Sequence, residues 1–128
     1  MSMTTTGYAA LAAGEGWHYV GETDQPAFEG AWGNSSGSPA MAFRIRESGV
    51  VDLAGSITGA TTASIFYLPE GYRPNVKTPG VVVYDTVNGA VSMQVDTDGL
   101  VKFNGGSLSG SVVNIQTQFF LDMPVNAP

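Results

Sequence analysis

The feature that most constrains the fold is a pattern that occurs twice along the chain. Residues 43–55 (FRIRESGVVDLAG) align with residues 93–105 (MQVDTDGLVKFNG), so that Gly49 corresponds to Gly99. In each copy, apolar residues alternate with polar ones up to a glycine-containing turn and alternate again after it, which predicts a β-hairpin. Two copies are too few for a solenoid or a propeller, which need several repeats to bury a continuous face. The pattern therefore predicts two similar hairpins in the two halves of one sandwich.

Short strands separated by turns account for the rest of the chain from Trp17 onward. Asn88-Gly89 marks a third hairpin, because Asn-Gly is the strongest short-range hairpin signal. No segment has a convincing helical period. The predicted fold is all-β, an antiparallel β-sandwich that is jelly-roll-like and has eight or nine strands. The expected strands are residues 17–20, 27–32, 40–46, 50–57, 63–68, 80–86, 90–96, 99–104 and 112–122.

The last of these strands has the clearest alternation between two faces. One face carries Val113, Ile115, Thr117, Phe119 and Leu121, and the other carries Asn114, Gln116, Gln118 and Asp122. Phe120 interrupts the polar face, so its ring lies where water is expected unless something covers it. Val81-Val82-Val83 lacks alternation altogether, which predicts a strand covered on both faces, on one of them by another subunit.

Composition agrees with a single domain that contains many turns. The chain has 128 residues, 17 Gly and 7 Pro, with 43% hydrophobic and 12% charged residues, which suits an all-β fold better than a charged, helix-rich one. Residues 1–16 are mostly Ser, Thr, Gly and Ala, and we expect them to form a flexible amino-terminal arm that becomes ordered against a neighbour in an assembly. Residues 17–128 form the sandwich domain.

Charge and cysteine content exclude several classes of partner and site. A net charge of -6 repels nucleic acid phosphates and anionic membranes, so neither is expected as a partner. The absence of cysteine excludes disulfides and thiol catalysis, and the chain must gain its stability from packing or assembly. No basic residue precedes the Ala10-Leu11-Ala12 segment, which imitates a cleavage site, so no signal peptide is expected. Apolar runs are far shorter than the roughly 18 residues of a membrane span.

Motifs that would carry chemistry lack the context they need, so we expect no catalytic residue, metal ligand or cofactor. Residues 33–37 (GNSSG) match a nucleophile elbow, yet no helix pattern follows and His18 lies upstream. His18 is expected to be structural, on the opposite face of its strand from the flanking aromatic residues. Residues 96–99 (DTDG) resemble the start of a calcium loop without its later glutamate, and we interpret them as a turn.

Aromatic side chains are the remaining candidates for contact with a ligand or another subunit. Trp17, Tyr19, Phe28 and Trp32 concentrate in the first quarter of the chain. Buried aromatic rings anchor cores and interfaces, whereas exposed rings form platforms that bind sugars. We favour a core or interface role and keep sugar binding as the alternative.

Residues 65–74 (IFYLPEGYRP) form an apolar strand that runs into a turn stiffened by proline. Because Pro69 and Pro74 donate no backbone hydrogen bond, the strand is expected to end near Leu68. Tyr72 and Arg73 then project from a stiff corner, where they are candidates for an intersubunit contact.

Together with residues 17–21 (WHYVG), 26–28 (PAF), Trp32 and residues 43–53, the segment Leu68–Pro74 resembles the distal β-sandwich domains of bacteriophage tail fibres and related virion surface proteins. The resemblance covers nearly the whole chain after the arm. It implies homotrimers that serve as receptor-binding heads or particle decorations, and it implies no particular binding residue. A chain that starts at Met1 has no shaft, so we expect a small separate virion component.

The resulting hypothesis is a non-enzymatic virion structural protein, a homotrimer displayed on the particle as a capsid decoration, head fibre or tail component. Other virion proteins are its expected partners, and a host-surface glycan is a further candidate. The alternative is a carbohydrate-binding adhesin that uses Trp17, Trp32 or Tyr72, for which two or more rings open on one face would be evidence. A third alternative, a small glycan hydrolase, requires two carboxylates about 5 to 10 Å apart in a groove.

Overall fold

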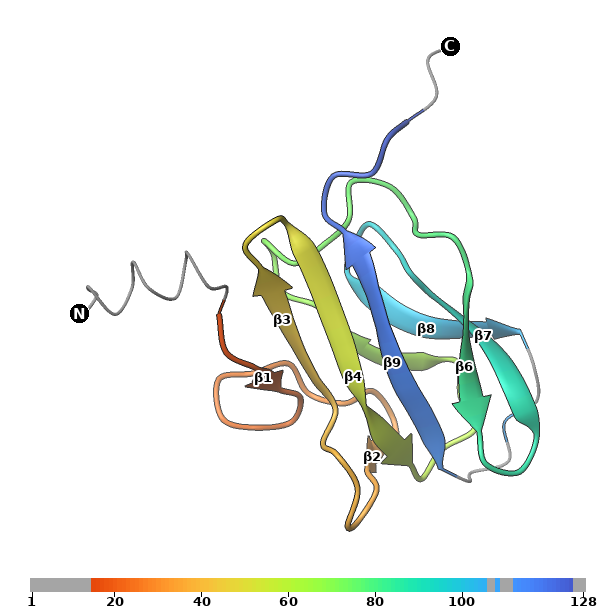
Figure 1. Ribbon diagram of the computed structural model, residues 1–128. Helices are drawn as coiled ribbons and strands as arrows, with labels where there is room; N and C mark the ends of the chain where they lie inside the picture. Colours follow the sequence, from red (N-terminus) through yellow and green to blue (C-terminus); the bar gives the residue numbers. More distant parts are fainter. Residues whose placement is uncertain (1–14, 106–107, 109–111, 126–128) are drawn as a thin grey trace.

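A computed structural model of the chain describes residues 15–105, 108 and 112–125 (Figure 1). This part of the chain forms nine antiparallel strands. One sheet joins the strands in the order β1-β3-β4-β9-β6-β7-β8-β5, and β2 pairs with β4 outside this path. These described ranges contain no helix, and hence no helix that could cross a membrane. The strands are β1 (His18–Tyr19), β2 (Gly33–Asn34), β3 (Ala42–Arg46), β4 (Val50–Thr58), β5 (Ser64–Tyr67), β6 (Val81–Asp85), β7 (Gly89–Val95), β8 (Leu100–Gly105) and β9 (Val113–Phe120).

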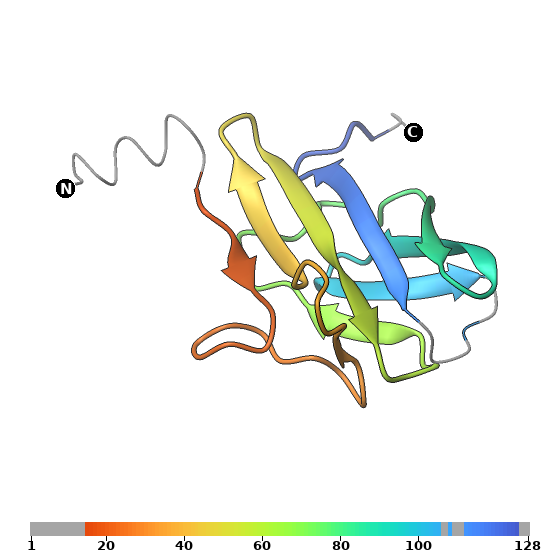
Figure 2. The same cartoon turned by 60° about the horizontal axis from the view of Figure 1, so that its bottom comes forward.

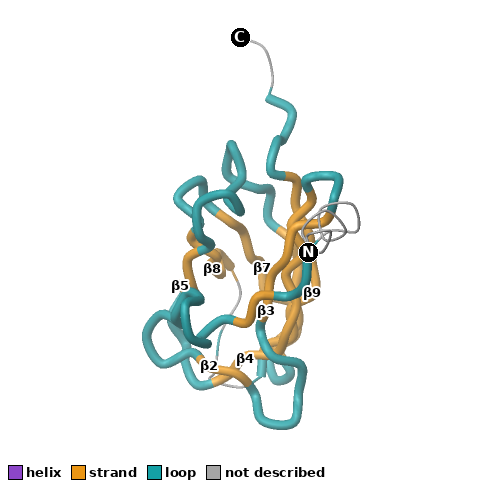
Figure 3. The backbone as a smooth tube through the Cα atoms, turned by 90° about the vertical axis from the view of Figure 1, so that its left-hand side faces the viewer, coloured by secondary structure: helices purple, strands orange, loops and turns teal. Residues whose placement is uncertain are grey.

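The sheet curls so that its two ends face each other across one core. Strands β5 and β8 lie on one side and β3, β4 and β9 on the other (Figure 3). Figure 2 shows that β7, β8 and β5 run across the direction of β3, β4 and β9. The prediction of an all-β, sandwich-like fold is therefore confirmed. The two layers belong to one continuous sheet, because β9 hydrogen-bonds to both β4 and β6.

The two copies of the sequence pattern form the predicted hairpins, one in each layer. Strands β3 and β4 pair from Ala42 with Ala54 to Arg46 with Val50, and β7 and β8 pair across the turn that contains Gly99. Gly49 and Gly99 both have positive φ angles, 79° and 91°, which a glycine adopts at little cost. The Asn88-Gly89 hairpin also forms, between β6 and β7.

The core is filled by apolar side chains from both layers. The Phe43 ring stacks on the Phe66 ring at a centroid distance of 5.9 Å, and the Trp32 ring packs on Phe103 at 5.6 Å. On β9, Val113, Ile115 and Phe119 are buried as predicted and Thr117 is half-buried, while Asn114, Gln116, Gln118 and Phe120 are exposed. Burial of this apolar surface is the main force that holds the curled sheet closed.

The expected strand at residues 27–32 is wrong. This segment forms only an isolated bridge between Phe28 and Phe66, and Gly30 has a φ of 57° that interrupts an extended conformation. Trp32 is buried because its ring enters the core, and its Nε1 donates a hydrogen bond to the Thr62 carbonyl oxygen at 3.0 Å. The aromatic residues in this segment therefore reflect insertion into the core, and the next strand along the chain is β2.

One face of β6 is covered within the single chain, and cover of its other face by another subunit stays a prediction. Val83 is buried, but Val82 is 74% exposed. The end of the preceding strand is as expected, because β5 stops at Tyr67, next to Leu68.

Gly55 marks the closest approach of two backbone segments. A Cβ atom at this position would lie 2.3 Å from the Met41 Cα and 2.7 Å from the Ala40 carbonyl oxygen, and Gly55 has a φ of 146°. The chain that leads into β3 thus lies so close beside β4 that only a hydrogen can be accommodated at Gly55.

We predict that Gly55→Ala lowers the free energy of unfolding by about 3 kcal/mol, because the methyl group forces two backbone segments apart. Gly33→Ala is the matched control, since a Cβ at Gly33 has no atom within 4 Å and the residue lacks a positive φ. Urea unfolding of both variants measures the difference. Equal stabilities would show that the close approach does not occur in solution.

Candidate interaction surface

The sheet opens where β9 and β6 part. These two strands pair only at Tyr84 with Asn114 and at Asp85 with Val113. Beyond these pairs, the described residues of β9 continue to pair with β4 while those of β6 continue to pair with β7. Along the rest of their described length, the facing edges of β9 and β6 are not paired with each other.

Asn75 closes the far end of the gap. Its backbone N–H donates to the Leu121 carbonyl oxygen at 3.0 Å, and its side-chain Oδ1 accepts a hydrogen bond from the Met123 N–H at 2.8 Å. The gap is thus bounded at one end by the β6–β9 ladder and at the other by this loop, and it leads from the surface to the core.

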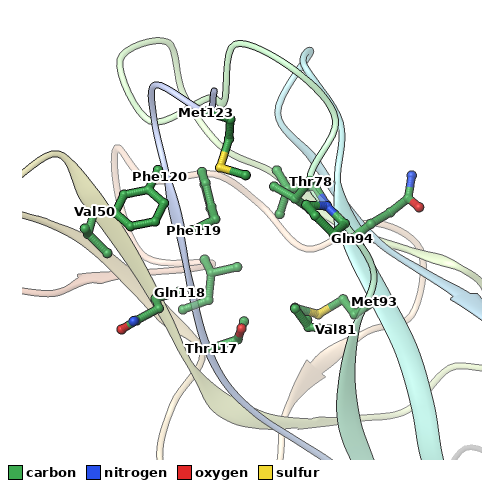
Figure 4. A pocket seen from close by; sticks show the side chains of 13 residues that line it. Val50, Thr78, Val81, Met93, Gln94, Thr117, Gln118, Phe119, Phe120 and Met123 are labelled. Atoms are coloured by element: carbon green, nitrogen blue, oxygen red, sulfur yellow. The ribbon is translucent and has the colours of Figure 1, made fainter. Parts of the chain in front are cut away.

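A hollow of about 260 Å³ occupies the gap. Figure 4 shows Val81 and Met93 on one side of it and Thr117 and Phe119 on the other. We call this hollow the apolar opening. Most of its lining is hydrocarbon, and its apolar members are Val50, Leu53, Pro79, Val81, Met93, Val95, Phe119, Phe120 and Met123.

Three large side chains beside the apolar opening are exposed to water. Phe120, on the β9 side, is 55% exposed, and Val82 and Tyr84, on the β6 side, are 74% and 59% exposed. They face outward because their neighbours Phe119 and Val83 point into the core. An apolar hollow flanked by exposed apolar side chains is typical of a surface that another molecule covers.

Tyr72 and Arg73, the predicted corner residues, make contacts within their own chain. The Tyr72 hydroxyl donates to Glu15 Oε1 at 2.9 Å and lies 3.0 Å from His18 Nε2. Arg73 Nε donates to the Leu68 carbonyl oxygen at 2.8 Å. The corner is therefore fastened to Glu15, to His18 and to Leu68 just after β5, and an intersubunit contact by these residues stays a prediction.

The expected arm at residues 1–16 stays a prediction, and only its last two residues are described. Glu15 belongs to the sheet edge, since its N–H donates to the Ile45 carbonyl oxygen at 3.2 Å and its carboxylate accepts a hydrogen bond from the Ile45 N–H at 3.0 Å. Residues 1–14, where the rest of the expected arm lies, are outside the described part of the chain.

A carboxylate, an imidazole and a hydroxyl meet at Glu15, His18 and Tyr72. The hydroxyl donates its proton to the carboxylate and not to the imidazole, so this arrangement does not activate a nucleophile. Burial raises the pKa of Tyr72, and the hydrogen bond to the Glu15 carboxylate raises this pKa further. Since the single phenol proton goes to Glu15, the contact with His18 requires a proton on Nε2 of the imidazole. Phe43 stacks on His18 at a centroid distance of 5.3 Å and also meets the Tyr72 ring edge-on at 5.1 Å. The cluster therefore joins the arm, β1 and the corner, as expected for a structural histidine.

The aromatic residues of the first quarter do not form one open platform. Trp17 and Tyr19 flank His18 and point to the outer face, whereas Tyr72 contacts the inner side of His18 and Trp32 is buried in the core. Trp17 packs against Arg44, whose guanidinium carbon lies 4.2 Å from the ring centroid. Of the residues expected at a core or an interface, Trp32 is in the core.

The other chemical motifs have structural roles in the folded chain. Asn34, in the elbow-like segment, accepts a hydrogen bond from the Met41 N–H at 2.8 Å and belongs to β2. Asp96 accepts a hydrogen bond from Gln94 at 2.8 Å, which lowers the pKa of the Asp96 carboxyl, and pairs with Lys102 at 3.3 Å. Among the described residues, no three His, Cys, Asp or Glu side chains are grouped so that they could hold a metal ion.

We predict that stability falls more steeply at alkaline pH in the native protein than in Tyr72→Phe. The raised pKa of Tyr72 means that the unfolded chain releases the phenol proton first, so the stabilisation is present below pH about 10 and is lost as pH rises beyond that value. At pH 7 the free energy of unfolding of Tyr72→Phe should be about 1 kcal/mol lower than that of the native protein, which is the usual contribution of one hydrogen bond.

Urea unfolding between pH 7 and pH 11 measures this difference. Tyr67→Phe is the control, because Tyr67 lies on β5 and is 41% exposed. An alkaline decline in Tyr72→Phe as steep as in the native protein would contradict the role assigned to this hydroxyl.

Comparison with known proteins identifies no relative of this chain. No protein-family model matches the sequence, and no curated protein is found to be similar to it. The apolar opening and the three exposed side chains beside it are therefore the features from which a function is inferred.

Proposed function

We propose that this protein is a non-enzymatic structural subunit of a bacteriophage particle, displayed on the surface as a capsid decoration, head fibre or tail component. In this proposal it acts as a homotrimer, and its partners are other virion proteins. The observation that carries the proposal is the apolar opening with Phe120, Val82 and Tyr84 exposed beside it. The resemblance of residues 17–74 to distal tail-fibre domains supplies the biological setting.

Association of subunits is favoured because a lone chain leaves this apolar surface in water. Fully burying one side chain of this size is worth about 1.5 to 3 kcal/mol, so covering three of them offsets part of the entropy lost when subunits associate. A cyclic trimer places the same surface of each chain against a different surface of the next and closes without free ends. The chain has no disulfide available to stabilise an exposed particle, which makes stabilisation by assembly useful.

A structural role is also favoured because the side chains with reactive groups are engaged in contacts within the fold. The only histidine, His18, packs against the rings of Phe43 and Tyr72, and the phenol of Tyr72 is kept protonated. These contacts stabilise the fold and leave no activated nucleophile in the described cluster.

We predict that the native protein sediments at three times the mass of one chain and that Phe120→Ser weakens this association at least tenfold. The tenfold change is expected because losing about 1.4 kcal/mol of interface energy changes the association constant tenfold. Sedimentation equilibrium across a range of concentrations measures it. Tyr67→Ser is the matched control, since Tyr67 is an exposed aromatic residue on β5, away from the opening.

A native protein that stays monomeric at high micromolar concentration would overturn the trimer. The same holds if Tyr67→Ser and Phe120→Ser weaken association equally, because the opening would then have no special part in it.

The virion setting has its own test. Antibodies raised against the purified protein should label intact phage particles of the source in electron micrographs, at regular positions on the head or tail. Particles that bind no antibody, from a lysate in which the protein is present in free form, would contradict the placement on the particle surface.

A further inference from the structure

The outer face of β3, β4 and β9 carries a shallow trough. Two hollows, of about 480 and 320 Å³, share Ala54 and Gln116 in their linings. From Ala54 the first extends toward Trp17 and Arg44, and the second toward Pro39. The two hollows adjoin at Ala54 and Gln116, and together we call them the polar trough.

Planar polar side chains form the wall of the polar trough, and their own contacts hold them in place. Arg44 Nε donates to Asp52 Oδ2 at 3.0 Å, and the Arg44 guanidinium packs on the Trp17 ring. Arg46 donates to Gln118 Oε1 at 2.6 Å and pairs with Asp52 Oδ1 at 3.1 Å. Side chains fixed in this way lose little conformational freedom when a ligand binds.

Hydrogen-bonding groups remain available for a ligand in this preorganised wall. Within the described part of the chain, the terminal nitrogens of Arg44 and the side-chain amide of Gln116 make no hydrogen bond. Guanidinium and amide groups are planar donors that bind carboxylates and hydroxyls with defined geometry.

The charge of the polar trough is opposite to that of the whole chain. Two arginines share the single carboxylate of Asp52, which leaves a local charge of about +1 on a chain of net charge -6. The arginine side chains are 36% and 41% exposed, whereas Asp52 is 14% exposed. A ligand therefore meets the cations before it meets the carboxylate.

We propose that the polar trough binds an acidic saccharide, a short oligosaccharide that carries a carboxylate. Its carboxylate pairs with the exposed guanidinium of Arg44 or Arg46, and its hydroxyls bind the Gln116 amide and neighbouring polar groups. Trp17 supplies an aromatic wall at one end. This inference goes beyond the structural role proposed above and does not rest on the trimer.

Other classes of ligand fit the trough less well. An extended peptide adds to a sheet through its backbone, but the trough lies on a sheet face, where the backbone groups of β4 are already paired with β3 and β9. A nucleic acid needs several phosphate contacts, and the net charge of the chain opposes its approach. An apolar molecule would leave the guanidinium groups without partners.

Binding is tested with a panel of uronate- and sialate-bearing oligosaccharides, followed by calorimetric titration of the strongest binder and of the same compound with its carboxyl group reduced to an alcohol. The native protein should bind the acidic compound at least tenfold more tightly than the reduced one. Ala54→Leu, which fills the floor of the trough, should weaken binding of the acidic compound at least tenfold.

Arg46→Gln should remove most of the preference for the acidic compound. Lys102→Gln is its charge-matched control, because it removes one positive charge from β8, in the other layer of the sheet, and should leave the preference intact. The Phe120→Ser variant should bind as the native protein does, so a failure of the trimer and a failure of the trough are distinguishable.

Three results would overturn the proposal. These are no binding of any acidic compound at millimolar concentration, equal affinity for the acidic and reduced compounds, or an equal loss of preference in Arg46→Gln and Lys102→Gln.

Discussion

The pairing of β9 is the constraint on which the rest of the structure depends. This strand pairs with β4 along its full length, from Val113 to Phe120, but with β6 only at its first two residues. The short ladder joins the two layers into one sheet, and the divergence beyond it lets the sheet curl around a common core. The same divergence creates the apolar opening, since two strands that part leave space that no side chain fills.

The two faces of the layer formed by β3, β4 and β9 have separate tasks. The inner face packs Phe43, Leu53 and Phe119 into the core. The outer face carries arginine, aspartate and glutamine side chains in fixed contacts around Ala54. Because directly opposite residues of paired strands point to the same side, the alternation of each strand places these residues together. One set of strands thus supplies both stability and a polar surface for recognition.

Much of the fold follows from local patterns that need no tertiary information. The hairpin turns at Gly49, Gly89 and Gly99 were predictable, because the residues between flanking strands leave few turn conformations open. The alternation on β9 correctly separated buried from exposed side chains, and it singled out Phe120 as an exposed aromatic residue. The segment at residues 27–32 failed, because aromatic residues that enter a core from a loop resemble those of a strand.

The candidate sites were less predictable than the fold. Phe120 and Val82 interrupt the expected alternation, and these two signals point to the apolar opening without revealing its shape. Tyr72 and Arg73 were placed on a corner from sequence, but their partners Glu15, His18 and Leu68 include residues more than fifty positions away. Contacts over such separations depend on how the sheet curls, which local patterns do not encode.

By itself, the sequence determined the fold class, the hairpins and the side of β9 that faces water, because these depend on propensities and on a period of two residues. Only the tertiary structure decided that β9 leaves β6, that Trp17 lies beside Arg44, and that Ala54 forms the floor of a trough. The physical reason is that each of these features depends on strand order and register, which are set by packing the whole core at once.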